Sequence, residues 1–206
     1  MLFRSGDIVE GIRPETRWPW VNELFEKYAG SFVGATVEVD GLKLNVLSSY
    51  VPAFRLMSRT EVAEQEGAEE VRLQHWPEVW GTELVWAAAT HRASGAPWII
   101  GGDMNSCETF DRTKPRGNRE FQERMVAAGF TEALRHAQGG ITPTFLNPRT
   151  KQVRNQIDHL FVENPLISSL LSCEVPDSQD FFDTGLSDHL PIIAEFDLGA
   201  IAEPSG

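Results

Sequence analysis

Cysteine, basic residues and long apolar stretches are all scarce in this sequence. The two cysteines, Cys107 and Cys173, are too few and too isolated for a disulfide framework or a structural zinc site, so we expect reduced, buried thiols in a cytoplasmic protein. Lys and Arg total 18 against 30 Asp and Glu, and the resulting charge of −12 repels polyanions unless cations or a local basic patch intervene. No apolar run approaches the roughly 20 residues that span a bilayer, so we expect no membrane partner.

Length and composition favour one domain. The 206 residues, 41% of them hydrophobic, can bury one substantial core, whereas two full domains would be tight. We assign residues 1–200 to a single domain and residues 201–206 to a C-terminal tail.

Turn residues and apolar runs predict the strands. Residues 31–50 hold two runs rich in Val, Leu and Thr joined at Asp40-Gly41, which predicts a hairpin because a tight two-residue turn requires positive φ. The short apolar run Trp98–Ile100 predicts a buried strand. Two further strands are predicted at residues 156–162 and 191–197.

Apolar residues at helical spacing predict helices between these strands. One amphipathic helix is predicted at residues 20–28, and another runs from Asn118 and stops at Gly129. Residues 59–92 predict one broken helix or two, because Pro77 interrupts the periodic pattern. Interleaved strands and helices favour an α/β architecture with sheets covered by helices.

Acidic and imidazole side chains gather in three short segments at or near strand ends. These are Gly101–Asn105 (GGDMN), Ile157–His159 (IDH) and Ser187–Pro191 (SDHLP). Each alone has a structural explanation, because Asp and Asn often shape or cap turns. Together they indicate a shared pocket, since turn formation does not require Asp beside His before one strand and a second Asp inside the preceding strand.

Here the sequence resembles a known family. GGDMN resembles the GDxN motif of the endonuclease/exonuclease/phosphatase superfamily, QIDHLFV resembles its Asp-containing strand, and SDHLP resembles its SDHxP signature, in the family's order. Residues 45–52 resemble the strand that ends in Tyr or His before Pro, and Thr142–Phe145 (TPTF) lies where the family usually has a Thr-x-Trp or Thr-x-Phe element. The resemblance implies a DNase I-like fold, a four-layer α/β arrangement of a two-sheet β-sandwich flanked by helices.

The resemblance also implies metal-dependent hydrolysis of phosphate esters and a role for each matching residue. Asp103 would orient and deprotonate the attacking water, with Asn105 beside it. His189 would contact a phosphate oxygen and stabilise the transition state, and Asp158 would accept the other ring N–H of His189.

Two further positions carry expected roles at the phosphate and the metal. Tyr50 matches the position from which family members point a Tyr or His at the phosphate, and an aromatic packed in the core is the alternative. Asp188 would bind the metal. Hard oxygen donors such as carboxylates suit Mg²⁺ or Mn²⁺ better than zinc. Arg149, Lys151 and Arg154 form a basic turn that is either solvated or in contact with a substrate phosphate.

The substrate stays open between DNA and smaller phosphate esters. Tyr50-Val51-Pro52 favours the DNA-repair nuclease branch, whereas the net charge and Ala53, where that branch usually has Asn, disfavour it. A catalytically silent binding module with the same scaffold is the alternative function.

One departure from the family concerns the start of the chain. Family members begin with a strand ending in Asn, followed by a Glu that binds the metal, and neither is recognisable here. Residues 1–5 resemble the strand that normally follows that Glu. We therefore expect an N-terminally truncated domain, with a fragment of a longer protein favoured over a short binding form or a site completed by another chain.

Overall fold

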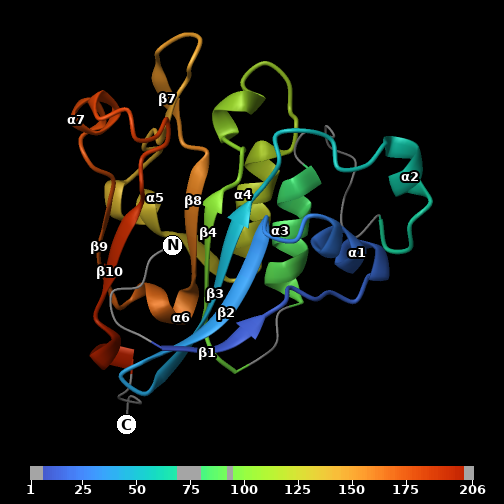
Figure 1. The fold of residues 1–206 in the computed structure, drawn as a ribbon, viewed down its shortest axis with the longest axis horizontal. Helices are drawn as coiled ribbons and strands as arrows, with labels where there is room; N and C mark the ends of the chain where they lie inside the picture. The colour runs from blue at the N-terminus through green and yellow to red at the C-terminus, as the bar shows by residue number, and fades with distance from the viewer. Residues whose placement is uncertain (1–6, 69–79, 92–94, 202–206) are drawn as a thin grey trace.

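A mixed six-stranded sheet forms the centre of the protein (Figure 1). The computed structural model describes residues 7–68, 80–91 and 95–201. The strand order is β1-β2-β3-β4-β8-β5, and all neighbours are antiparallel except β3 and β4. The bounds are β1 (Asp7–Ile12), β2 (Phe32–Val39), β3 (Leu42–Tyr50), β4 (Trp98–Asp103), β8 (Asp158–Glu163) and β5 (Phe130–Glu132).

Two smaller strand pairs and several helices surround this sheet. The pairs are β9 (Leu170–Glu174) with β10 (Ile193–Phe196), and β6 (Phe145–Leu146) with β7 (Val153–Asn155). The helices are α1 (Pro19–Lys27), α2 (Arg59–Ala63), α3 (Trp80–Thr90), α4 (Asn118–Ala127), α5 (Ala133–Gln138), α6 (Asn164–Ile167) and α7 (Ser178–Asp183), with 3-10 turns η2 (Glu108–Asp111) and η3 (Leu198–Ile201).

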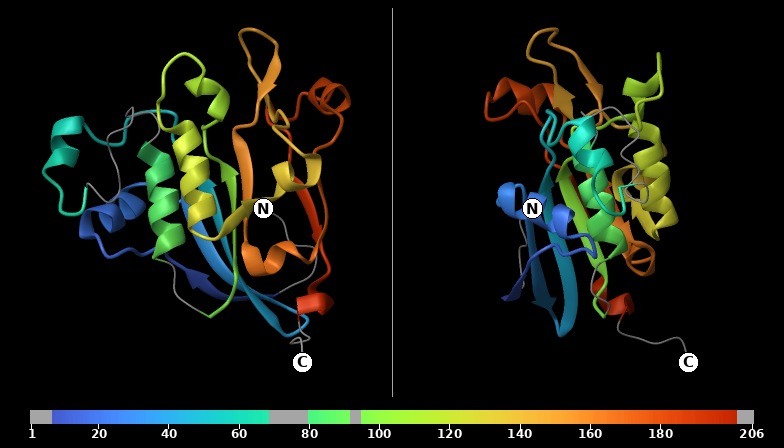
Figure 2. Two further views of the ribbon diagram at one scale, coloured as in Figure 1. Left: turned by 180° about the vertical axis from the view of Figure 1, so that it is seen from behind. Right: turned by 90° about the vertical axis from the view of Figure 1, so that its right-hand side faces the viewer.

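Each face of the central sheet has its own apolar core. Because side chains alternate along a strand, the neighbours Val46 and Leu47 in β3 enter opposite cores. The core of Leu47 includes residues of α1, α3 and α4, and the core of Val46 includes residues of α5, β9 and β10. Figures 1 and 2 show the β9–β10 pair and the α3–α4 pair on opposite sides of the sheet. This arrangement of sheet, second sheet and helices confirms the predicted α/β fold class.

Most predicted elements that fall on described residues are confirmed. The hairpin turns at Asp40 (φ 51°) and Gly41 (φ 80°), as its sequence requires. Residues 20–28 lie in or next to α1, and the helix predicted from Asn118 is α4. Residues 59–92 contain two separate helices, α2 and α3, and Pro77 lies outside the described residues.

Three further expectations concern the start of the chain, the cysteines and membrane-spanning helices. The strand expected within residues 1–5 lies outside the described residues. Both cysteines are buried and unpaired, as predicted. Within the described part of the chain, no helix is long and apolar enough to cross a membrane.

Candidate active site

Three of the predicted side chains lie side by side on the central sheet. Tyr50 at the end of β3 is in register with Asp103 at the end of β4, and Asp103 is in register with Asp158 at the start of β8. All three belong to the strand positions that face the β9–β10 side, because Val46, Ile99 and Val162 of the same strands enter that core. The hydrogen-bond ladder of the sheet therefore sets the spacing of the candidate residues.

A tight turn after β4 fixes the Asp103 carboxylate. Asn105 has a left-handed backbone (φ 46°), and its backbone N–H donates to Asp103 Oδ1 at 2.8 Å. The Asn105 side chain donates from Nδ2 to Asp103 Oδ2 at 3.0 Å and to the Val51 carbonyl at 2.8 Å. Both oxygens of Asp103 are thus held by one residue, which is itself anchored to the end of β3.

Gly102 allows β3 and β4 to approach closely just before Asp103. Its φ is 142°, and a Cβ atom there would lie 1.8 Å from the Ser49 carbonyl oxygen. Neither the backbone conformation nor the space accepts a side chain.

We therefore expect Gly102→Ala to lower the free energy of unfolding by roughly 2–4 kcal/mol, because it combines backbone strain with a clash inside the sheet. Gly140 is the matched control, since a Cβ there meets nothing within 4 Å and its φ is not left-handed. Urea denaturation of both variants measures the difference. Equal stability of the two variants would contradict the close packing at Gly102.

His189 is oriented by Asp158. Its Nδ1 lies 3.1 Å from Asp158 Oδ1 and 3.0 Å from Oδ2, so the ring donates from Nδ1 and directs Nε2 away from Asp158. The hydroxyl of Thr144 donates to Asp158 Oδ2 at 2.7 Å. The same hydroxyl oxygen accepts the backbone N–H groups of Ile157 and Asp158 at 3.2 Å. Thr144 is fully buried and therefore acts as a fixed support for the Asp158–His189 pair.

The loop that carries Asp188 and His189 is attached to β6. Leu146 N–H donates to the Asp188 carbonyl at 2.9 Å, and Leu190 N–H donates to the Thr144 carbonyl at 2.7 Å. The rings of Phe145 and His189 lie 4.9 Å apart. The segment Thr144–Leu146 therefore positions the loop as well as Asp158, a role that the sequence pattern alone does not assign to it.

Burial and neighbouring charges shift two pKa values at the site. Burial raises the pKa of Asp103 to about 6, with Asp158 adding to the rise and the hydrogen bonds from Asn105 opposing it. The hydrogen bond to Asp158 raises the pKa of His189 above its usual value, although burial opposes this. The contact with Asp158 therefore favours the protonated form of His189 close to Asp103.

His159 does not join the site, although it follows Asp158 in sequence. It projects to the opposite face of the sheet, where its ring stacks on Phe161 at 5.6 Å and its Nε2 donates to the Ser106 carbonyl at 2.8 Å. Burial lowers the pKa of His159. It is a neutral core histidine.

One group of described residues could hold a metal ion. Asp103, Asp158 and His189 each offer a ligand atom, and these atoms lie within 4.8 Å of one another. Asp188, the ligand expected from the sequence, lies at the rim of this group with its Oδ1 4.0 Å from His189 Nε2 and its side chain 56% exposed.

Comparison with known sequences agrees with this geometry. The sequence profile of the endonuclease/exonuclease/phosphatase family matches residues 13–189, which include every residue of the cluster. The chain belongs to the endonuclease/exonuclease/phosphatase family. No curated protein sequence matches it.

Several solved structures share the fold. An AP endonuclease from Archaeoglobus fulgidus aligns with a TM-score of 0.57 and 21% identity over 81% of this chain. A 3′-5′ exonuclease from Neisseria meningitidis aligns with a TM-score of 0.52 and 22% identity, also over 81% of this chain. A Neisseria 3′ phosphatase bound to a product DNA hairpin aligns with a TM-score of 0.55 and 21% identity over 89% of this chain. The aligned regions span 65% of the first two proteins and 70% of the third.

The fold brings together all six residues that the family resemblance selected. Asp103, Asn105, Asp158 and His189 are linked by the contacts above, and Asp188 lies at their rim. Tyr50 is 52% exposed, so the alternative of an aromatic packed in the core is wrong. The basic turn lies outside this group of six residues. Arg149 precedes β7 and Arg154 lies within it, on the hairpin beside the site.

Proposed function

We propose that this chain hydrolyses phosphodiester bonds by metal-assisted attack of water, and that DNA is its substrate. The observation that carries the proposal is the cluster of Asp103, Asp158 and His189, whose side-chain oxygen and nitrogen atoms lie within 4.8 Å of one another. The two carboxylates come from the ends of paired strands, and His189 comes from the loop before β10. The solved relatives support the choice of DNA, since they include an AP endonuclease and a phosphatase bound to DNA.

In this proposal each side chain acts through its observed contacts. Asp103, held by Asn105, accepts a proton from the attacking water, and a pKa near neutral suits that task. His189 is oriented by Asp158, which leaves Nε2 to donate to a phosphate oxygen as charge develops there. Tyr50, exposed beside Asp103, contacts the same phosphate through its hydroxyl.

Carboxylate oxygens suit a hard divalent cation, and we propose Mg²⁺ or Mn²⁺ with Asp188 as a ligand. The carboxylate of Asp158 already accepts from Thr144 and His189, and that of Asp103 accepts from Asn105. Apart from its approach to His189, the Asp188 carboxylate has no polar partner among the described residues, so it is the group most available to an ion. The cation would neutralise charge on the phosphate as a Lewis acid.

An assay of the purified chain tests the function. Abasic-site duplex DNA, undamaged duplex DNA and bis(p-nitrophenyl) phosphate are incubated with chelator or with Mg²⁺ or Mn²⁺, and Asp103→Asn is the control. We expect metal-dependent cleavage that this variant lacks, and Asp188→Asn should raise the metal concentration required by roughly 10-fold or more. A folded chain that cleaves none of these substrates would instead be a catalytically silent binding module.

The pH dependence of kcat/KM should be bell-shaped. Asp103 must be ionised, so the rate should rise as pH increases through about 6. His189 must be protonated, so the rate should fall at a pH above the usual histidine range, because Asp158 raises its pKa. In Asp158→Asn the alkaline limb should move to lower pH, because the His189 pKa loses the contribution of Asp158. The acidic limb should stay in place or also move to lower pH, because Asp158 contributes to the raised pKa of Asp103. An unchanged alkaline limb would show that His189 is not the group that titrates there.

A further inference from the structure

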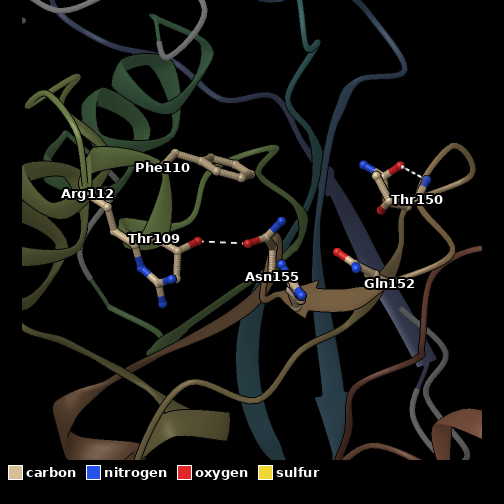
Figure 3. Close-up of a pocket in the computed structure, with 8 residues that line it drawn as sticks. Thr109, Phe110, Arg112, Thr150, Gln152 and Asn155 are labelled. Carbon is tan, nitrogen blue, oxygen red and sulfur yellow. Dashed lines mark hydrogen bonds between the residues drawn. The ribbon is translucent and has the colours of Figure 1, made fainter.

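A polar cavity of about 460 Å³ lies beside the candidate site. One wall is η2 and the residue after it, which follow the Asp103–Asn105 turn, and the other wall is the β6–β7 hairpin, which leads into β8 and Asp158. Figure 3 shows side chains from both walls, with Phe110 and Arg112 on one side, Thr150 and Gln152 on the other, and Asn155 between them. The two walls thus continue the two segments that carry the catalytic carboxylates.

Direct contacts join the cavity to the site. Thr109 Oγ1 donates to Asn155 Oδ1 at 2.8 Å, which ties the two walls together. Asn155 pairs with Phe145 across the hairpin, and the ring of Phe145 lies 4.9 Å from that of His189. The cavity therefore lies close to His189, within reach of a strand that extends from the site.

The lining of the cavity is suited to an anion. Arg112 and Arg154 line it together with hydroxyl and amide side chains, and no Asp or Glu among the described residues does. Neither guanidinium forms an ion pair within the described ranges. Arg149 and Lys151 flank Thr150 on the same hairpin and are exposed. In a chain with a net charge of −12, this is a local concentration of positive charge next to the proposed site.

An exposed aromatic ring adds a second kind of contact. Phe110 is 36% exposed and lines the same cavity as the two arginines. Guanidinium groups that bind phosphates, next to an aromatic ring on which a base can stack, are the combination that recognises a nucleic acid strand. A small ester with a single phosphate could use only part of this surface.

We propose that Arg112 and Arg154 bind a second phosphate of the nucleic acid strand whose scissile phosphate lies at Asp103 and His189. The inference rests on the proposed phosphodiesterase function and adds a subsite to it. It also explains how an acidic protein can hold a polyanion, since the positive charge is concentrated where the strand would leave the site.

The test compares substrates with one phosphate and with many. The full chain and the variants Arg112→Ala, Arg154→Ala and their double mutant are assayed on bis(p-nitrophenyl) phosphate and on short duplex DNA. We expect the ratio of kcat/KM for DNA to that for the small diester to fall roughly 10-fold per arginine, mostly through KM. The salt dependence of KM for DNA should become shallower by about one unit of log–log slope per lost phosphate contact.

Lys43→Ala is the matched control, because it removes one exposed positive charge near the opposite end of β3 from Tyr50. An unchanged ratio in the double mutant, equal to that of Lys43→Ala, would overturn the subsite. An equal loss of kcat/KM on both substrates would also overturn it. That result would mean that the arginines contact the scissile phosphate itself or are needed for folding.

A binding measurement separates this proposal from the function on which it rests. Fluorescence anisotropy reports the affinity of the Asp103→Asn chain for a labelled DNA duplex, with and without the two arginine substitutions. If no substrate is cleaved but the arginine substitutions still weaken binding roughly 10-fold or more, the proposed catalysis fails and the anion subsite stands. If binding is unaffected, the subsite fails whether or not the chain is active.

Discussion

Asp103→Asn should lower kcat by a factor of roughly 100 to 10,000 without unfolding the protein. The loss follows because an amide cannot accept the proton of the attacking water. Stability at neutral pH should change little, because the substituted amide has only one oxygen and loses one of the two hydrogen bonds that Asp103 accepts from Asn105. Against this loss, the substitution removes the cost of the ionised form in the folded state, since burial raises the Asp103 pKa to about 6. That cost is absent below the usual Asp pKa and grows as pH rises through about 6.

Two measurements on one sample check this prediction. Single-turnover cleavage gives the chemical rate, and urea denaturation at neutral and acidic pH gives the free energy of unfolding. Asn105→Gly is a useful companion, because glycine accepts the left-handed backbone at this position (φ 46°) and the substitution leaves the carboxylate in place but removes the Nδ2 donor that restrains it. A variant of Asp103 that keeps more than about a tenth of wild-type kcat would rule out a role as general base.

His189→Ala should also cost a factor of about 100 to 1,000 in kcat, because it removes the side chain that we propose as the donor to the phosphate. Asp158→Asn alone should cost about 10- to 100-fold, since Asp158 acts by orienting and charging the His189 ring. The important expectation concerns the double mutant. Once His189 is gone, Asp158 has no ring to orient, so the second substitution should add little.

The kcat values of the four proteins in this cycle measure the coupling. Strong non-additivity would support a single functional unit of Asp158 and His189. If the two losses simply multiply, Asp158 acts on the substrate or metal directly. Thr144→Val provides a graded comparison, because it deletes the 2.7 Å hydrogen bond to Asp158 while preserving the shape of the side chain. It also removes the acceptor of the Ile157 and Asp158 backbone N–H groups, so its free energy of unfolding is measured alongside its kcat.

Local sequence signals were sufficient for the long elements of the fold. The hairpin of β2 and β3 could be predicted because Asp40-Gly41 permits positive φ between apolar runs, and α1 and α4 because their apolar residues recur at helical spacing. The short strands β5, β6, β7 and β9 could not be predicted in this way. They have two to five residues, and their pairing with distant segments supplies the stability that their own sequences lack.

The site was accessible to sequence reasoning only in part. The motifs identify Asp103, Asn105, Asp158, Asp188 and His189 as candidates, but they do not reveal that Asp103 and Asp158 are cross-strand partners. The neighbours Asp158 and His159 look equivalent in sequence, and the period of a strand sends them to opposite faces. The support from Thr144 and the cavity beside Asn155 depend on contacts between segments, which no local pattern encodes.

The in-register row of Tyr50, Asp103 and Asp158 has an evolutionary consequence. The backbone hydrogen bonds between β3, β4 and β8 set the spacing of this row, whereas η2 and the β6–β7 hairpin form the walls of the cavity beside it. Insertions or substitutions in those walls can change which molecules are accepted without moving the row. A scaffold divided in this way lets new substrates be acquired by mutation at the rim while the reaction itself is inherited intact, and directed evolution of this chain should begin with residues 109–112 and 147–155.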